Sequence, residues 1–353
     1  MEIRALKLIA VKNGSNLSCR ALLDPKKIPM IPEITFEEVR AEALRLGWDD
    51  VGITEAHIPE DDIEAYKTWL ANNYQGDLQY MENHIRCDPQ QLFPGAKTAI
   101  IFVTHYKQER VQFRNDAGVV ASYARGRDYH HLHRKRLKKF ILWLEQRSGQ
   151  SNIAKGFSDS TPVMEKALAV QAGLGWFGKN TLLIHRRFGT FLLLSGLFTS
   201  LNIQEKSLNL RLPRCGTCRR CLDACPTQAF EAPYVLNATK CLSYHLIESK
   251  KEIPEEIQKK NPGYVFGCDI CQDVCPHNVR PKPSTVPEFS PNQGMGAYLS
   301  LEDIEKIEHN PEKLFGTPLQ RRGATGLRHT FETLNLQNPN ENDHSEMKED
   351  KHG

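Results

Sequence analysis

Eight of the ten cysteines in this 353-residue chain lie between Cys215 and Cys275, in two runs that each end in Cys-Pro. The first run has the spacing C-x2-C-x2-C-x3-C-P, and the second has the same ending with its first cysteine displaced upstream. Bacterial ferredoxins use this spacing to hold two 4Fe-4S clusters, because three cysteines of a loop ligate one cluster and the fourth ligates the other. The pattern therefore predicts a two-cluster path for electrons.

The same rule assigns the eight candidate metal ligands to two groups. The first cysteine group is Cys215, Cys218, Cys221 and Cys275, and the second cysteine group is Cys225, Cys241, Cys268 and Cys271. Structural zinc also uses C-x2-C pairs, but it needs neither a third cysteine in the loop nor the Cys-Pro ending. Disulfides are less favoured than zinc, because cytosolic thiols stay reduced. Cys19 and Cys87 match neither run, and we expect them to be ordinary thiols.

Composition restricts the class of protein only broadly. A hydrophobic content of 40% over 353 residues can form a sizeable core, and the length predicts two domains plus appendages. The net charge of +3 is too small to indicate a nucleic-acid-binding protein. Basic residues gather between Arg125 and Lys139 and again between Arg321 and His329, where a solvated helix face is the simpler interpretation. We find no signal peptide and no apolar stretch of membrane-spanning length, so we expect a cytoplasmic protein without a membrane partner.

Local patterns predict the elements that position the chemical groups. Thr35 and Glu38 form a capping box at the start of a helix that continues through Leu46. Apolar patterns predict strands at residues 50–54, 98–106 and 190–199, and helices at residues 128–146 and 162–172. This alternation of helices and strands favours an α/β (α+β) layer structure between residues 34 and 205.

The segment from Gly173 to Gly178 matches the G-x-G-x-x-G pattern of dinucleotide-binding proteins. That site requires a strand before the glycines and a helix after them, whereas here a helical pattern precedes and the strand comes later. We therefore expect Gly173 to end the preceding helix in the left-handed conformation. The other glycines let the backbone approach a bulky group, and Lys179 and Asn180 supply polar groups there.

Asp159 precedes a Ser-Thr-Pro sequence at the predicted start of the helix at residues 162–172. One interpretation makes it the N-cap residue, with Pro162 at the first helical position. The other places its carboxyl group at a cofactor site, where it gives or takes a proton. A helix N-terminus lowers the pKa of a carboxyl group, whereas burial against an apolar cofactor raises it. A proton donor requires the second effect to prevail.

Several motifs together resemble the epoxyqueuosine reductases. The string KGFSDSTPVMEKALAVQAGLGWFGKNTLLI is followed by CGTCRRCLDACPTQAF and then by GCDICQDVCP. The earlier strings DVGIT, GDLQYM, FPGAKTAIIF and YARGRDYHH also match, in the same order. The resemblance covers roughly residues 35–335 and rests on several independent motifs.

This resemblance implies a fold, a reaction and two kinds of cofactor. It implies a cobalamin-binding domain of the reductive-dehalogenase/nitroreductase-like type, followed by a ferredoxin-like domain with two 4Fe-4S clusters. The implied reaction is the last step of queuosine biosynthesis, in which an epoxide at the wobble position of tRNA is reduced to an alkene. Two electrons are needed, and we expect a low-potential ferredoxin or flavodoxin to supply them to a monomeric enzyme.

The resemblance also implies roles for single residues. Asp159 is similar to the proposed proton donor of the family, and Lys166 occupies the place of a basic residue in the cofactor pocket. Lys179 and Asn180 match the family's GKN, and Tyr129 and His130 match its DYH, near cofactor or substrate. The expected phosphate contacts with tRNA are Arg125, Arg127, Arg186, Arg187, Arg321, Arg322 and Arg328.

Two other functions fit the same cysteines. A reductive dehalogenase would use the same cofactors on a small organohalide, and a plain electron-transfer protein would use the first domain only as a docking scaffold. Retention of cobalamin would distinguish the reductase and the dehalogenase from a plain electron-transfer protein, which would not retain it. The expected divisions of the chain are an extension (1–33), a catalytic cobalamin-binding domain (34–205), a cluster domain (206–285), a basic C-terminal segment (286–334) and a disordered tail (335–353).

Overall fold

The computed structural model describes residues 33–203 and 214–334. The expected extension, except for its last residue, and the expected tail lie outside the described residues. The helices are α1 (Phe36–Arg45), α2 (Glu60–Ala71), α3 (Pro89–Leu92), α4 (Tyr129–Ser148), α5 (Glu165–Gln171), α6 (Arg220–Asp223), α7 (Leu242–Ile247), α8 (Glu255–Lys259), α9 (Ile270–Asp273), α10 (Leu301–His309) and α11 (Gly323–Glu332). The strands are β1 (Asp50–Glu55), β2 (Thr98–His105), β3 (Ala117–Val120), β4 (Ala154–Phe157), β5 (Trp176–Phe177), β6 (Leu183–Ile184), β7 (Leu192–Thr199), β8 (Phe230–Ala232), β9 (Val235–Leu236), β10 (Tyr264–Phe266) and β11 (Tyr298–Ser300).

A four-stranded sheet with the order β1-β2-β7-β4 forms the centre of the first half of the chain. All of its neighbouring strands pair antiparallel. The three strands predicted from the sequence are confirmed as β1, β2 and β7, and every residue of β2 is buried. The mixed α and β class is therefore confirmed, in an antiparallel sheet with helices packed on it.

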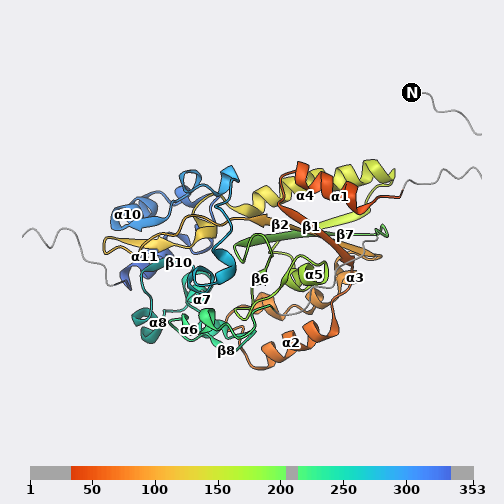
Figure 1. Cartoon of the computed structure of the whole chain (residues 1–353). Coiled ribbons are helices and arrows are strands. Elements are labelled where there is room, and N and C mark those ends of the chain that lie inside the picture. Colours follow the sequence, from red (N-terminus) through yellow and green to blue (C-terminus); the bar gives the residue numbers. More distant parts are fainter. Residues whose placement is uncertain (1–32, 204–213, 335–353) are drawn as a thin grey trace, which may run out of the picture.

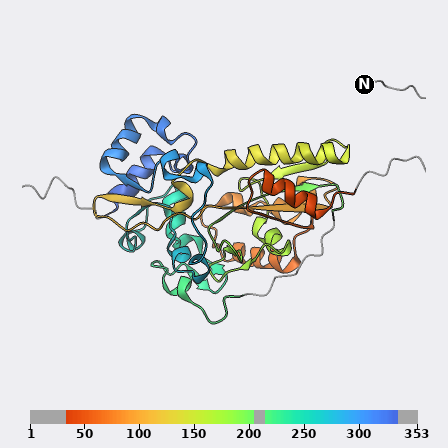
Figure 2. The same cartoon turned by 45° about the horizontal axis from the view of Figure 1, so that its top comes forward.

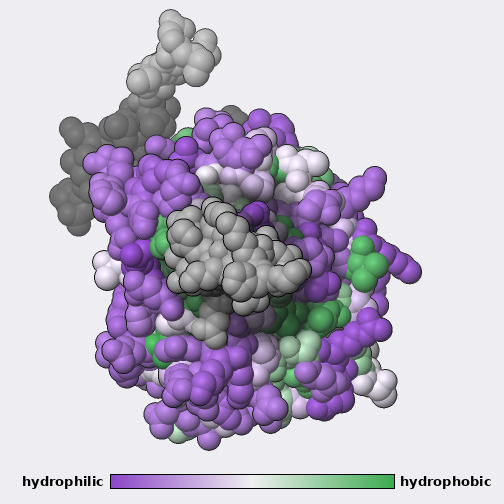
Figure 3. All heavy atoms as spheres, turned by 90° about the vertical axis from the view of Figure 1, so that its left-hand side faces the viewer, coloured by the Kyte–Doolittle hydropathy of each residue, from purple (hydrophilic) through white to green (hydrophobic). Residues whose placement is uncertain are grey.

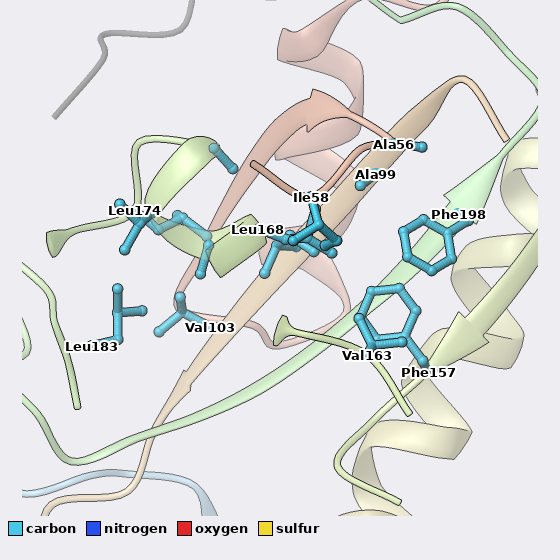
Figure 4. Packing of buried hydrophobic residues seen from close by; sticks show 14 of the residues in the cluster. Ala56, Ile58, Ala99, Val103, Phe157, Val163, Leu168, Leu174, Leu183 and Phe198 are labelled. Atoms are coloured by element: carbon cyan, nitrogen blue, oxygen red, sulfur yellow. The ribbon is translucent and has the colours of Figure 1, made fainter. Parts of the chain in front are cut away.

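Helices cover both faces of this sheet, α1 and α4 on one side and α5 on the other (Figure 1). Side chains of β2 alternate between the two faces, as the period of a strand requires. Ile100 and Phe102 pack with the residues of α1 and α4, while Ile101 and Val103 pack with Leu168 of α5 and its neighbours (Figure 4). The segments at the start of α4 and the end of β4 are thus attached to this core.

A second sheet joins distant parts of the chain. Strand β3 from the first half pairs parallel with β10 and antiparallel with β11. Helices α10 and α11 pack beside this sheet, with Phe266, Leu299 and Leu327 fully or almost fully buried there. The segments expected to form three successive domains therefore share one sheet and one apolar core.

Local signals define most helix ends correctly and misplace one. The capping box of Thr35 and Glu38 is present at the start of α1, and Asp128 caps α4. Gly173 has the expected left-handed backbone, with φ of 76°. Helix α5 begins at Glu165 rather than at Pro162, so the prediction that Asp159 and Pro162 start this helix is wrong. Residues 159–162 form a bend instead, and Met164 is the N-cap residue of α5.

No helix within residues 33–203 and 214–334 has the length and apolar content needed to cross a membrane. The face at the left of Figure 1, which carries α10, shows mostly hydrophilic side chains, with a smaller group of hydrophobic ones (Figure 3).

Candidate active site and cluster-binding cysteines

The structure brings the four thiols of the first cysteine group together. Burial and the neighbouring thiols of Cys215, Cys221 and Cys218 raise the pKa of Cys275 to about 11. Burial and the thiols of Cys215 and Cys218 likewise raise the pKa of Cys221. Repulsion between thiolates requires them to lie close together. Cys275, more than 50 residues away in the sequence, therefore lies beside the three cysteines of the first loop.

The second cysteine group is assembled in the same way. The pKa of Cys271 is well above its usual range because the thiol is buried and lies near Cys268, Cys241 and Cys225. The pKa of Cys268 is raised by burial and by Cys241 and Cys225. All eight cysteines of the two groups are free thiols. The displaced Cys241 therefore lies where the spacing rule puts it.

These surroundings fit iron-sulfur clusters. Thiolates that burial and mutual repulsion destabilise become favourable ligands when cationic iron lies between them. The Cys225 sulfur accepts a hydrogen bond from the Ala229 amide at 3.3 Å, a contact that tunes cluster potentials. Within the described ranges, no three His, Cys, Asp or Glu side chains are placed to hold a single metal ion. A cubane is ligated at its corners, so its cysteines need not converge on one point.

Asp159 lies at the centre of a hydrogen-bonded network that begins at α4. The Tyr129 hydroxyl donates to Asp159 Oδ2 at 2.8 Å, and His130 Nε2 lies 3.2 Å from the same oxygen. His130 Nδ1 lies 2.6 Å from Asp128 Oδ1, so a carboxylate faces each nitrogen of the ring. The first turn of α4 therefore positions one carboxyl group with a phenol and an imidazole. The structure therefore brings two residues of the sequence motif DYH into contact with Asp159.

The charges in this network favour a carboxylate beside an imidazolium. Partial desolvation by the surrounding protein opposes the charge on Asp159, but hydrogen bonds from His130 and Tyr129 outweigh that effect and lower the pKa of Asp159. Burial also opposes the charge on His130, but Asp128 and Asp159 raise the pKa of His130 to about 9. Near neutral pH His130 is therefore protonated, and its Nε2 donates a hydrogen bond to the Asp159 carboxylate. The Asp159 side chain is 60% exposed, so a further group can still lie against it.

The backbone of Asp159 is in the left-handed region, with φ of 50°. A non-glycine residue held there is strained, and such strain gathers at functional sites. The Asp159 amide donates to Glu165 Oε1 at 2.8 Å, which holds the turn. Burial and the charge of Asp159 raise the pKa of Glu165 to about 8. The N-cap interpretation of Asp159 is wrong, because this residue lies outside α5 and the first residue of that helix restrains it.

Of the other predicted cofactor residues, Lys179 and Asn180 lie in the loop between β5 and β6, and Lys166 of α5 contacts that loop. Lys166 Nζ donates to the Thr181 carbonyl at 2.8 Å. Lys179 Nζ donates to the carbonyls of Gly216 at 2.7 Å and Cys218 at 3.0 Å, in the first cysteine group. Asn180 Nδ2 donates to the carbonyl of Cys271 at 3.4 Å, in the second group. This loop thus connects the first half of the chain to both cysteine loops.

The sequence gives no indication that Arg321, Glu248 and Tyr80 lie together at the edge of the site. Arg321, at the end of the 3₁₀ helix η9 (Pro318–Arg321), pairs with Glu248 through its Nε and Nη2 atoms. Its guanidinium lies 5.8 Å from the ring centre of Tyr80, in η1 (Gln79–Glu82). Its charge also helps to lower the pKa of Asp159. No local motif links these three segments, because only the tertiary fold brings them together.

Two of the predicted phosphate contacts are structural instead. Arg125 is 3% exposed, and its guanidinium donates to the carbonyls of Val120 and Glu109. Arg322 is 7% exposed and donates to the carbonyls of Ser249 and Gly326. The prediction that these two residues contact phosphate is therefore wrong, because their guanidinium groups are buried in hydrogen bonds within the protein and are not accessible to RNA. The side chains of Arg127, Arg186, Arg187 and Arg321 remain exposed, and Arg328 pairs with Glu332.

Comparison with known families gives two matches. The family model described as epoxyqueuosine reductase QueG matches residues 86–160, which include Tyr129, His130 and Asp159. The model described as a 4Fe-4S double cluster binding domain matches residues 214–278, which include all eight cysteines. The cysteine-rich part of the chain is therefore a domain for two 4Fe-4S clusters, in preference to the zinc alternative.

Curated relatives match nearly the whole chain. The epoxyqueuosine reductase of Cellulophaga algicola is 38% identical over 300 residues, which are 84% of this chain and 96% of the relative. The epoxyqueuosine reductase of Escherichia coli is 35% identical over 299 residues, or 81% of this chain and 77% of the relative.

Solved structures show the same fold. The epoxyqueuosine reductase of Streptococcus thermophilus matches with a TM-score of 0.73 at 26% identity, over 86% of this chain and 82% of that one. An epoxyqueuosine reductase crystallised with an epoxyqueuosine-modified tRNA-Tyr stem loop matches with a TM-score of 0.72 at 25% identity, over 83% and 79%. The predicted fold of a catalytic domain followed by a two-cluster domain is confirmed by these matches.

Proposed function

The chain belongs to the epoxyqueuosine reductase family, and on this premise we propose that it reduces epoxyqueuosine in tRNA to queuosine, as the last step of queuosine biosynthesis. One observation supports the proposal independently of the similarity to other family members. The proton network of Tyr129, His130 and Asp159 lies in a domain that a single loop connects to both cysteine groups. The chain therefore combines a proton source with a path for electrons.

The reaction requires both. Two C–O bonds of the epoxide break, a C=C bond forms, and the oxygen leaves as water after accepting two protons and two electrons. Each cluster passes one electron at a time, from a low-potential protein donor of the ferredoxin or flavodoxin class. We assign to Asp159 the transfer of a proton to the leaving oxygen, with His130 as the group that restores that proton. The two cysteine groups ligate the two clusters.

The residues around Asp159 are compatible with a bound cobalamin, which would link the clusters to the substrate. The Asp159 carboxylate is oriented by two hydrogen bonds yet is largely exposed, so it can face a large planar group. Lys166 and His130 would contact that group, while Lys179 and Asn180 would position it through the loop that they anchor. When bound, cobalamin supplies a centre that accepts electrons singly and delivers two. Covering Asp159 removes water from its carboxyl group and raises its pKa, which favours the proton-donor form.

Nucleoside analysis of tRNA tests this function directly. In a strain without the gene for this chain, we expect epoxyqueuosine to accumulate in the cytoplasmic tRNA and queuosine to be absent. The wild-type chain should restore queuosine, and the chain with Asp159→Ala should not. Normal queuosine in the deletion strain would contradict the proposal. The purified protein should elute as a monomer and retain cobalamin, which a plain electron-transfer protein would not.

A further inference from the structure

We propose that the exposed face of α4 binds the phosphate backbone of the RNA substrate next to Asp159. The inference rests on the proposed function and names the surface that the substrate uses. We call this face the α4 stripe; it consists of His131, Arg134, Lys135, Lys138 and Lys139.

The Lys and Arg side chains of the α4 stripe lack acidic partners among the described residues; Arg134 donates to the His130 carbonyl at 3.2 Å and lies 3.5 Å from His131 Nδ1. Its members recur at three- and four-residue intervals, so they lie along one side of the helix. Among the described residues, none of the four Lys and Arg side chains forms an ion pair with an acid, whereas Lys259 and Lys306 on other helices each pair with a glutamate four residues away. Like charges at this spacing destabilise a helix. An anionic partner would relieve that repulsion.

The position of the stripe points to RNA rather than to an acidic electron donor. Its first member follows Tyr129 and His130, which contact Asp159. From there α4 runs away from the cysteine-bearing segments, along the sheet that Leu137 and Phe140 pack against (Figures 1 and 2). At a rise of about 1.5 Å per residue the stripe spans about 12 Å, enough for a few consecutive phosphates. A donor protein must instead approach the clusters.

The test replaces Lys135, Lys138 and Lys139 together by alanine, which favours helix formation. The matched control replaces Lys259, Lys306 and Lys313, which are equally exposed and change the net charge equally. We expect the stripe variant to bind tRNA at least about 10-fold more weakly near 0.1 M salt. The dependence of log K on log salt should become less steep by about one unit per lost contact. The control variant should bind as the wild type does.

Each outcome decides a different question. Equal tRNA affinity in the stripe variant and the wild type overturns the inference, even if the wild type still forms queuosine. Unchanged tRNA affinity with slower reduction by a ferredoxin or flavodoxin assigns the stripe to the donor instead, and also overturns it. If the wild type binds tRNA without converting epoxyqueuosine, the proposed function fails rather than the surface.

A separate observation concerns Trp176, and from it we infer that the indole N–H of this residue donates a hydrogen bond to the cluster of the first cysteine group. Trp176 is 2% exposed and packs with Cys275 and Cys215. Its Nε1 is buried without a protein acceptor. The indole nitrogens of Trp48 and Trp69, in contrast, donate to Ser195 Oγ and to the Leu236 carbonyl.

The missing acceptor is the reason for the inference. A buried N–H without a hydrogen-bond partner destabilises the folded protein. Sulfur atoms of a cluster held by Cys215 and Cys275 would be acceptors in contact with the ring. A hydrogen bond to such sulfur stabilises the more negative, reduced cluster and raises its reduction potential. Trp176 is thus a positioning and tuning residue for electron transfer rather than a catalytic one.

The test removes the N–H while keeping the ring. Replacing Trp176 by 3-benzothienylalanine, in which sulfur takes the place of the nitrogen, should lower the midpoint potential of one cluster and leave the other unchanged. Trp176→Phe should shift the same cluster in the same direction, and Trp48→Phe should shift neither. The measurement is a redox titration followed by electron paramagnetic resonance. An unchanged potential in the benzothienylalanine protein overturns the inference.

Discussion

Replacing Asp159 by alanine is expected to slow conversion of epoxyqueuosine by about 100-fold or more, the usual contribution of a positioned proton donor. The reason is structural, because two hydrogen bonds and a left-handed backbone hold this one carboxyl group in place. Turnover of tRNA should be measured with saturating substrate, together with iron content and bound cobalamin, which should stay at wild-type levels.

Two controls make this result specific. Asp159→Asn keeps the size and the hydrogen-bond acceptor but has no proton to give, so it should lose nearly as much activity as alanine. Asp116→Ala removes an exposed carboxylate that pairs with Arg114 outside the cysteine runs, and its activity should be unchanged. Activity of Asp159→Asn close to that of the wild type would show that the residue orients neighbours rather than transferring a proton.

The pH profile of the same enzyme gives an independent measure of the network. His130 has a pKa of about 9, raised above its ordinary value, so it carries its proton below that pH and loses it above. Maximal turnover should therefore decline as the pH rises through about 9, because the group that restores the proton to Asp159 is then neutral. His130→Gln should be slower at neutral pH and should lack this decline. A wild-type profile that is flat across that range would argue against proton supply by His130.

Local sequence signals predicted elements well where a single segment contains the whole signal. The capping box of α1, the run of apolar residues in β2 and the left-handed Gly173 each depend only on near neighbours. The start of α5 was misplaced because the Asp159 turn resembles a helix N-terminus locally. Its actual conformation depends on hydrogen bonds to Tyr129 and His130, about 30 residues away. Long-range contacts of this kind override a local capping preference.

Some residues of the candidate site could likewise be predicted from the sequence, and others could not. The eight cysteines follow a spacing rule whose physical basis is the geometry of a cluster, so the grouping could be predicted before any fold was known. The edge formed by Arg321, Glu248 and Tyr80 joins segments more than 70 residues apart and has no such rule. The sequence also does not reveal that Arg125 and Arg322 are buried. An arginine that donates to backbone carbonyls and one that binds phosphate are the same residue in a sequence.

Replacing Cys241 by alanine is expected to remove one cluster and to abolish conversion of epoxyqueuosine. Cys241 lies at the N-cap of α7, far in sequence from its group, and burial and Cys225 raise the pKa of its thiol. Removing one of four thiolates leaves the second cluster with an open corner in a buried site, whereas the first cysteine group keeps all four ligands. Iron should therefore fall from about eight to about four atoms per chain.

The remaining cluster should keep its electron paramagnetic resonance signal upon reduction, which identifies it as the cluster of the first cysteine group. Cys87→Ala is the matched control, because this free thiol lies outside both groups, and its iron content and activity should equal those of the wild type. Loss of both clusters in Cys241→Ala would count against their independent assembly. Retention of both would break the ligand assignment.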